Sequence, residues 1–207
     1  MIYVSIDIET SGMNEDTCQV WEFAAVIEDT AKDILLTDLP KFHTIVTQDV
    51  YQGEIFAMNM HADLLKMHAN DEYRISKGVD KCHNKDLASR FWSFIYKYFP
   101  QAFEQFRING KETAINIAGK NFNGFDRNFL KKVPHMMASS GFGYGYRFHH
   151  RVIDPAPLYV RPEDENLPGL ETCLERAGYA GDVKHGAYSD ALDVIKVIRA
   201  SGKFNNE

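Results

Sequence analysis

Acidic side chains in separate parts of the chain stand in settings that suit metal binding. Asp7 and Glu9 lie two residues apart in an alternating, β-branched run, so both should point to one face of a strand. Two carboxylates that project together repel each other and are costly to bury unless a cation lies between them. A hard cation with oxygen ligands, Mg²⁺ or Mn²⁺, is the usual solution.

Two later stretches offer groups that could complete such a site. Asp126 follows the apolar run 113–118 and an Asn-containing loop that opens a predicted helix. His185 stands just before a second predicted helix, and Asp190 lies in its first turn, where the helix dipole favours an ionised carboxylate. An Asp-x-Glu pair alone is weak evidence, but the three stretches together are more specific.

This ordered set resembles the DEDDh branch of the DnaQ-like 3′-to-5′ exonucleases over nearly the whole chain and in family order. Residues 7–13 are similar to the first motif of the family, Asp126 to the second, and His185 with Asp190 to the third. The stretch 119–130 is also similar to the second motif of oligoribonucleases, although those enzymes place a tyrosine nearer the final aspartate. The resemblance implies a ribonuclease H-like α/β fold with a mixed five-stranded sheet flanked by helices.

The resemblance also implies a mechanism with two Mg²⁺ or Mn²⁺ ions about 3.5–4 Å apart. Asp7 would bridge both ions, while Glu9 and Asp190 would complete the inner site. Asp126 would hold the hydration shell of the second ion. His185 titrates near neutrality and would take the proton from the attacking water, although it could also be a capping or surface histidine.

Three more residues are implied at the 3′ end of a bound strand. Met13 follows the first-motif glycine and would pack against the terminal base, while Thr10 would offer its backbone N–H to the 3′-hydroxyl. Phe122 would stack on the penultimate base, or would equally well be a core residue. The sequence does not choose between DNA and RNA, because that choice depends on contact with a 2′-hydroxyl.

Periodic apolar patterns predict the elements that must position these side chains. We expect strands at residues 3–8, 20–28, 42–47, 113–118 and 151–154. We expect helices at residues 61–69, 85–99, 124–132, 168–177 and 188–200. The segment 134–150 contains a run of glycines, aromatics and basic residues, which is typical of a loop that contacts nucleic acid or of an ordinary exposed loop.

Other candidate residues have simpler interpretations. His61 and His68 lack a third ligand at an obvious spacing, so they are expected to be solvated or to lie at the edge of the core. Asp154 ends a predicted strand before a proline turn and is expected either to support the residues of the site from behind or to be structural. The three cysteines form no Cys-x-x-Cys pair, which favours reduced, buried thiols.

Composition fits a single exonuclease domain over residues 1–207, since 44% hydrophobic and 13% aromatic residues can fill a sizeable core. No apolar run is long enough to span a membrane, and charges within residues 2–23 argue against a signal peptide, so a soluble, cytoplasmic protein is expected. The net charge of −6 argues against a protein that coats nucleic acid, but not against a nuclease whose acids hold metal ions.

The leading hypothesis is a metal-dependent 3′-to-5′ exonuclease that releases nucleoside 5′-monophosphates from single-stranded DNA or RNA. A catalytically silent nucleic-acid-binding or polymerase-associated module is the main alternative, and an endonuclease on structured substrates is a weaker one. The complete set of acids and the histidine argues against a silent module, because binding alone needs neither. Homodimerisation and association with a polymerase are left open.

Overall fold

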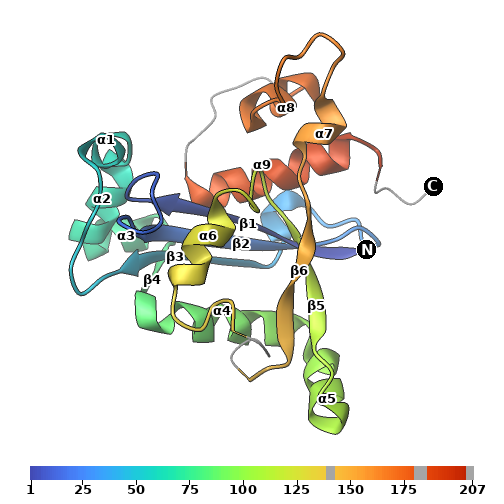
Figure 1. Cartoon of the computed structure of the whole chain (residues 1–207), viewed down its shortest axis with the longest axis horizontal. Helices are drawn as coiled ribbons and strands as arrows, with labels where there is room; N and C mark the ends of the chain where they lie inside the picture. Colours follow the sequence, from blue (N-terminus) through green and yellow to red (C-terminus); the bar gives the residue numbers. More distant parts are fainter. Residues whose placement is uncertain (139–142, 180–185, 204–207) are drawn as a thin grey trace.

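The computed structural model describes residues 1–138, 143–179 and 186–203, and a mixed sheet runs through its centre (Figure 1). Six strands of the described chain form this sheet in the order β4-β3-β2-β1-β5-β6. Pairs β1/β2 and β2/β3 are antiparallel, whereas β1/β5, β5/β6 and β3/β4 are parallel. The strands are β1 (Ile2–Thr10), β2 (Val20–Asp29), β3 (Lys41–Thr47), β4 (Asp80–His83), β5 (Thr113–Ala118) and β6 (Tyr146–Ile153).

Helices cover both faces of the sheet. Figure 1 shows α9 and α4 on opposite sides, and α6 beside the centre of the sheet. The helices are α1 (Ile55–Met60), α2 (Ala62–Ala69), α3 (Asp71–Ser76), α4 (Asn84–Tyr98), α5 (Pro100–Asn109), α6 (Asp126–Lys132), α7 (Ala156–Tyr159), α8 (Leu170–Arg176) and α9 (Ala187–Ala200), with a 3₁₀ turn, η1, at Leu36–Asp38. None of the described helices is long and apolar enough to cross a membrane.

The central strand β1 divides the core into two layers. Val4, Ile6 and Ile8 are buried in the larger cluster together with Phe91 of α4. Tyr3 belongs instead to the cluster that contains Val194 of α9. Alternation along β1 therefore sends successive side chains to opposite faces, as the sequence pattern predicts.

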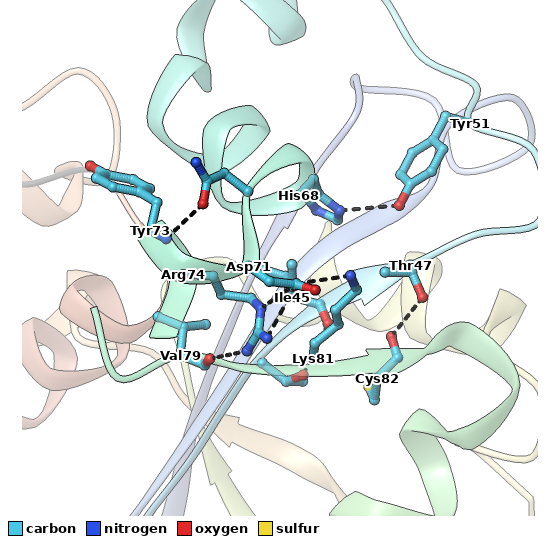
Figure 2. Close-up of polar contacts among 12 residues, drawn as sticks. Ile45, Thr47, Tyr51, His68, Asp71, Tyr73, Arg74, Val79, Lys81 and Cys82 are labelled. Atoms are coloured by element: carbon cyan, nitrogen blue, oxygen red, sulfur yellow. Dashed lines mark hydrogen bonds and ion pairs between the residues drawn. The ribbon is translucent and has the colours of Figure 1, made fainter. Parts of the chain in front are cut away.

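Figure 2 shows the polar contacts that hold the short edge strand β4. Buried Arg74 of α3 donates to the carbonyl oxygen of Val79 at 2.6 Å, just before β4 begins. Its guanidinium also lies 3.3 Å from the carboxylate of Asp71, which in turn contacts Nζ of Lys81 at 3.0 Å. His68 bridges the hydroxyl of Tyr51 and a backbone carbonyl oxygen, so it lies at the edge of the core as predicted.

The predicted α/β fold is confirmed, with differences at the edges of the sheet. All five predicted strands and all five predicted helices are present. The sheet has six described strands rather than the five that we expected. The additional strand, β4, is short, and its mainly polar residues show no clear alternation, so the sequence pattern did not predict it. Strand β6 begins at Tyr146, so the interpretation of 134–150 as a loop is wrong from that residue onward. The three cysteines are buried and unpaired, as expected.

Candidate active site

Three of the predicted acids lie together on the side of the sheet covered by α9. Asp7 and Glu9 share one face of β1 with Ser5, whose hydroxyl donates to the carbonyl oxygen of Ala191 in α9 at 2.8 Å. Asp190 lies in the first turn of that helix. Carboxylate oxygens of Asp7, Glu9 and Asp190 all lie within 4.8 Å of one another. A strand and a helix from opposite ends of the chain thus form one acidic cluster.

Asp126 is the first residue of α6 and is only 4% exposed. After burial, the charge of Asp126 is the next largest cause of the raised pKa of Asp7. The pKa of Asp126 is itself raised by burial, and a hydrogen bond from the backbone N–H of Ile8 on β1 offsets part of that rise. Asp126 therefore borders the cluster from a third element. The four acids that the sequence singles out come together in space.

The loop between β5 and α6 has local features that bring Asp126 close to β1. A side chain at Gly119 would meet the carbonyl oxygen of Ile6 at 2.8 Å, so this close approach requires glycine. Asn121 has a left-handed backbone, with φ of 55°, which asparagine tolerates better than most residues. Its N–H donates to the carboxylate of Asp154 at 2.8 Å, so Asp154 helps to hold the loop that carries Asp126.

Burial and mutual repulsion raise the pKa values across the cluster. Burial raises the pKa of Asp7 well above its ordinary value, and the charges of Asp126, Asp190 and Glu9 raise it further. Burial, followed by the charge of Glu22, raises the pKa of Glu9 to about 8. Burial also raises the pKa of Asp126 to about 7. At neutral pH these carboxyl groups therefore cannot all ionise without a compensating positive charge.

The donor set fits a hard divalent cation. The cluster offers carboxylate oxygens and no sulfur, which suits Mg²⁺ or Mn²⁺ better than a thiolate-binding metal. Asp7, Glu9 and Asp190 could hold an ion directly, and Asp126 could help with a second one. Such an arrangement can bind a phosphodiester and lower the barrier to attack by water.

Glu22 is a fifth acid at the site, and no local sequence pattern singles it out. It stands directly opposite Glu9 in the β1/β2 pair and is 4% exposed. Its carboxylate contacts Nε2 of His43 at 2.6 Å and accepts the backbone N–H of Ala187 at 3.1 Å. The ring of His43 stacks on Tyr188. The Glu22–His43 pair therefore holds the start of α9, three residues before Asp190.

His61 also lies beside the cluster rather than simply at the edge of the core. Its Nε2 is 3.5 Å from a carboxylate oxygen of Glu9, and its side chain is 15% exposed. His61, Leu64, Glu9 and Tyr188 help to line a pocket of about 280 Å³ next to the acids. The lining of the pocket includes both apolar and polar side chains. Sequence spacing could not indicate this contact, because it joins β1 to the junction of α1 and α2.

The residues predicted to bind the 3′ end lie in different environments. Met13 is 73% exposed and available for contact. Thr10 is buried, and its hydroxyl donates to the carbonyl oxygen of Gly12 at 2.7 Å. Phe122 is fully buried in the larger core cluster, which favours the core alternative because its ring is not exposed to a base. The predicted general base, His185, lies outside the described residues.

Comparisons with known proteins support the fold. No protein-family model matches the sequence, and a search of curated proteins finds no similar sequence. Among solved structures, exonuclease I from Methylocaldum szegediense superposes with a TM-score of 0.58 at 15% identity, over 98% of this chain and 41% of that chain. The zinc-bound form of the E. coli exonuclease I–ssDNA complex gives 0.59 at 17% identity, over 96% and 40%.

A third structure, E. coli exonuclease I in complex with a 5cy-dT13 oligonucleotide, has a TM-score of 0.55 at 16% identity, over 96% of this chain and 40% of that chain. These identities are too low to show more than the fold, which is the predicted ribonuclease H-like one. The chain spans about two fifths of the length of these exonuclease I chains.

Removing one acid should stabilise the metal-free protein. Because the folded-state pKa values are raised, the cluster costs little stability near pH 5 and progressively more as the pH rises to about 8. In chelator, Asp7→Asn should therefore raise the Tm by a few degrees, with a larger gain at pH 8 than at pH 5. A change of about 1 kcal/mol shifts Tm by roughly 2–4 °C in a chain of this size. Thermal unfolding followed by circular dichroism measures this gain.

The matched control is Asp33→Asn, which removes the same charge from an exposed position. It should leave the Tm nearly unchanged at both pH values. A Tm for Asp7→Asn that is lower than that of the wild type at pH 8 would contradict the repulsion argument.

Loss of the histidine partner of Glu22 should destabilise the start of α9. Among the described residues, His43→Ala leaves the buried carboxylate of Glu22 with the N–H of Ala187 as its one donor. An unsatisfied buried group costs about 1–3 kcal/mol, so we expect a fall in Tm of several degrees in chelator. The control is His150→Ala, at an exposed histidine, which should change the Tm little. Equal Tm values for the two variants would argue against a positioning role for His43.

Proposed function

We propose that this chain is a divalent-metal-dependent 3′-to-5′ exonuclease that acts on single-stranded DNA or RNA and releases nucleoside 5′-monophosphates. The observation that carries the proposal is the convergence of Asp7, Glu9 and Asp190, with oxygens within 4.8 Å, next to buried Asp126. The fold is shared with exonuclease I, and solved structures of that enzyme include complexes with oligonucleotides and with ssDNA. These facts support the proposal, which also rests on the motif resemblance.

In this proposal the acids hold two Mg²⁺ or Mn²⁺ ions, as the resemblance implies. Asp7, Glu9 and Asp190 would hold the inner ion, and Asp126 would contribute to the second. When bound, the ions supply activation of water and neutralisation of charge on the phosphoryl oxygens. Residues of the chain accept the proton and position the start of α9. His185 accepts the proton of the attacking water, and the Glu22–His43 pair keeps the start of α9 in place.

The end of the strand is held beside the acids. Met13 packs against the terminal base, and the backbone N–H of Thr10 binds the 3′-hydroxyl. The pocket lined by His61 and Leu64 is large enough for part of a nucleotide, which supports a site for the terminal residue next to Glu9. A single domain spanning residues 1–207 carries all of these groups. The oligoribonuclease-like second motif makes short RNA a substrate to include in assays.

A 5′-labelled single-stranded oligonucleotide tests the proposal. With Mg²⁺ we expect a descending ladder of products, no activity in excess chelator, and inhibition by a 3′-phosphate that crowds the site of the terminal hydroxyl. Asp7→Asn should remove nearly all turnover, whereas Asp33→Asn should retain it. Cuts within a circular single strand would indicate an endonuclease. Strand binding without any cleavage would favour the silent module.

The general base has its own test. His185→Ala should lower turnover by roughly 10²–10⁴-fold, the usual contribution of general-base catalysis, while leaving metal affinity nearly unchanged. The acidic limb of the pH–rate profile should disappear with the imidazole, because that limb reports protonation of the base. Rates measured from pH 5 to pH 9, with calorimetric metal binding beside them, make the distinction. An unchanged rate and profile would reassign His185 to a structural role.

A further inference from the structure

The edge strand β6 contains an irregular segment of histidine and arginine that the proposed chemistry does not use. Ile115 pairs with Phe148 and Ile117 with Val152, so three residues of β6 stand opposite Asn116 alone. We call these three residues the basic bulge: His149, His150 and Arg151. Bulges occur often at sheet edges and next to active sites, where they redirect side chains.

Two more arginines adjoin the basic bulge. Arg147 precedes it on the same strand and is exposed, with a long 3.8 Å contact to Glu112. Arg127 of α6 donates to the carbonyl oxygen of His149 at 2.7 Å and lies over the ring of Phe122. Among the described residues, neither Arg127 nor Arg151 forms an ion pair with a carboxylate. The segment is therefore a concentration of positive charge in a chain of net charge −6.

The pKa of His150 reflects the basic groups that lie close to it. Local desolvation is the main cause that lowers this pKa. Neighbouring basic groups lower it further, namely His149, Arg151, Arg147 and Arg127. The rings of His149 and His150 are stacked, with centroids 4.5 Å apart. A nucleobase can stack on an exposed aromatic face of this kind, while arginines bind phosphates.

The basic bulge lies within reach of a strand bound at the acids. Arg127 directly follows Asp126 in the chain, and its guanidinium contacts the bulge. Strands β1, β5 and β6 are parallel, with Ser5 level with Ala118 and Ala118 level with Ile153. From strand spacing and rise, the bulge lies roughly 15–20 Å from Asp7, a distance that a few nucleotides span.

We propose that the basic bulge, together with Arg127 and Arg147, binds the sugar–phosphate backbone of a single-stranded substrate a few nucleotides to the 5′ side of the bond that is cut. This inference rests on the proposed exonuclease function and extends it to the upstream part of the strand. Charge complementarity carries it. Arg127 and Arg151 form no ion pair with a carboxylate of the described chain, and Arg147 has only the long 3.8 Å contact with Glu112. Backbone phosphates are the natural partners of such arginines beside a nucleic-acid site. Longer substrates therefore bind more tightly than very short ones.

Equilibrium binding in chelator tests the inference without requiring catalysis. The probe is a fluorescein-labelled single-stranded oligonucleotide of about 20 nucleotides, followed by anisotropy over a salt series. The double variant Arg147→Gln/Arg151→Gln should bind more weakly, and its dependence of log K on log salt should be shallower by about 0.7 for each phosphate that the variant no longer neutralises. The control, Lys97→Gln/Arg107→Gln, removes two exposed charges from α4 and α5 and should bind like the wild type.

Kinetics separate upstream binding from chemistry. With Mg²⁺, the Arg147→Gln/Arg151→Gln variant should show a raised KM and an unchanged kcat for the long oligonucleotide. It should hydrolyse a trinucleotide at the same rate as the wild type. Equal affinity and salt slope in this variant and the wild type would overturn the inference. If the wild type cleaves nothing but the variant still binds the oligonucleotide more weakly, the exonuclease proposal fails while the strand-binding surface stands. Circular dichroism confirms that both double variants are folded.

Discussion

Repulsion among the carboxylates at the end of β1 is the constraint on which the rest of the structure depends. Asp7, Glu9 and Asp126 all have raised pKa values, with burial as the main cause. In the described part of the chain, no lysine or arginine forms an ion pair with any of these three acids. A fold that gathers so much negative charge without a lysine or arginine partner suits a positive charge from outside, and a divalent cation supplies the most in the least space.

The scaffold must hold the acids together against that repulsion. The hydroxyl of Ser5 ties β1 to α9 through Ala191, and Glu22 ties β2 to the same helix through Ala187. On the other side of the cluster, Gly119 permits the loop before α6 to pass against β1. Each acid therefore projects from an element that is fixed independently of the charge it carries. This preorganisation is what a metal site needs, since ligands that must first be ordered bind weakly.

Local sequence patterns predict where the acids lie on their strand and helices, but not which residues surround them. Alternation places Asp7 and Glu9 on one face, and a helix start explains Asp190, so each follows from residues nearby in the chain. Glu22 joins the site only because the β1/β2 register sets it opposite Glu9, and no local pattern fixes that register. The contact of His61 with Glu9 and the burial of Phe122 likewise depend on how distant elements pack. Strand β4 was not predicted, because its four mostly polar residues show no alternation of apolar and polar side chains.

The most direct test of a metal site at these acids is calorimetric titration of the wild-type protein with Mn²⁺ near pH 7, repeated in buffers of different ionisation enthalpy. Carboxyl groups with raised pKa values must lose protons when a cation binds, so we predict saturable binding coupled to proton release. The apparent enthalpy should then vary with the buffer, and the affinity should increase from pH 6 to pH 8. Absence of binding, or binding with no proton release across that range, would contradict the central claim that the acidic cluster is a metal site.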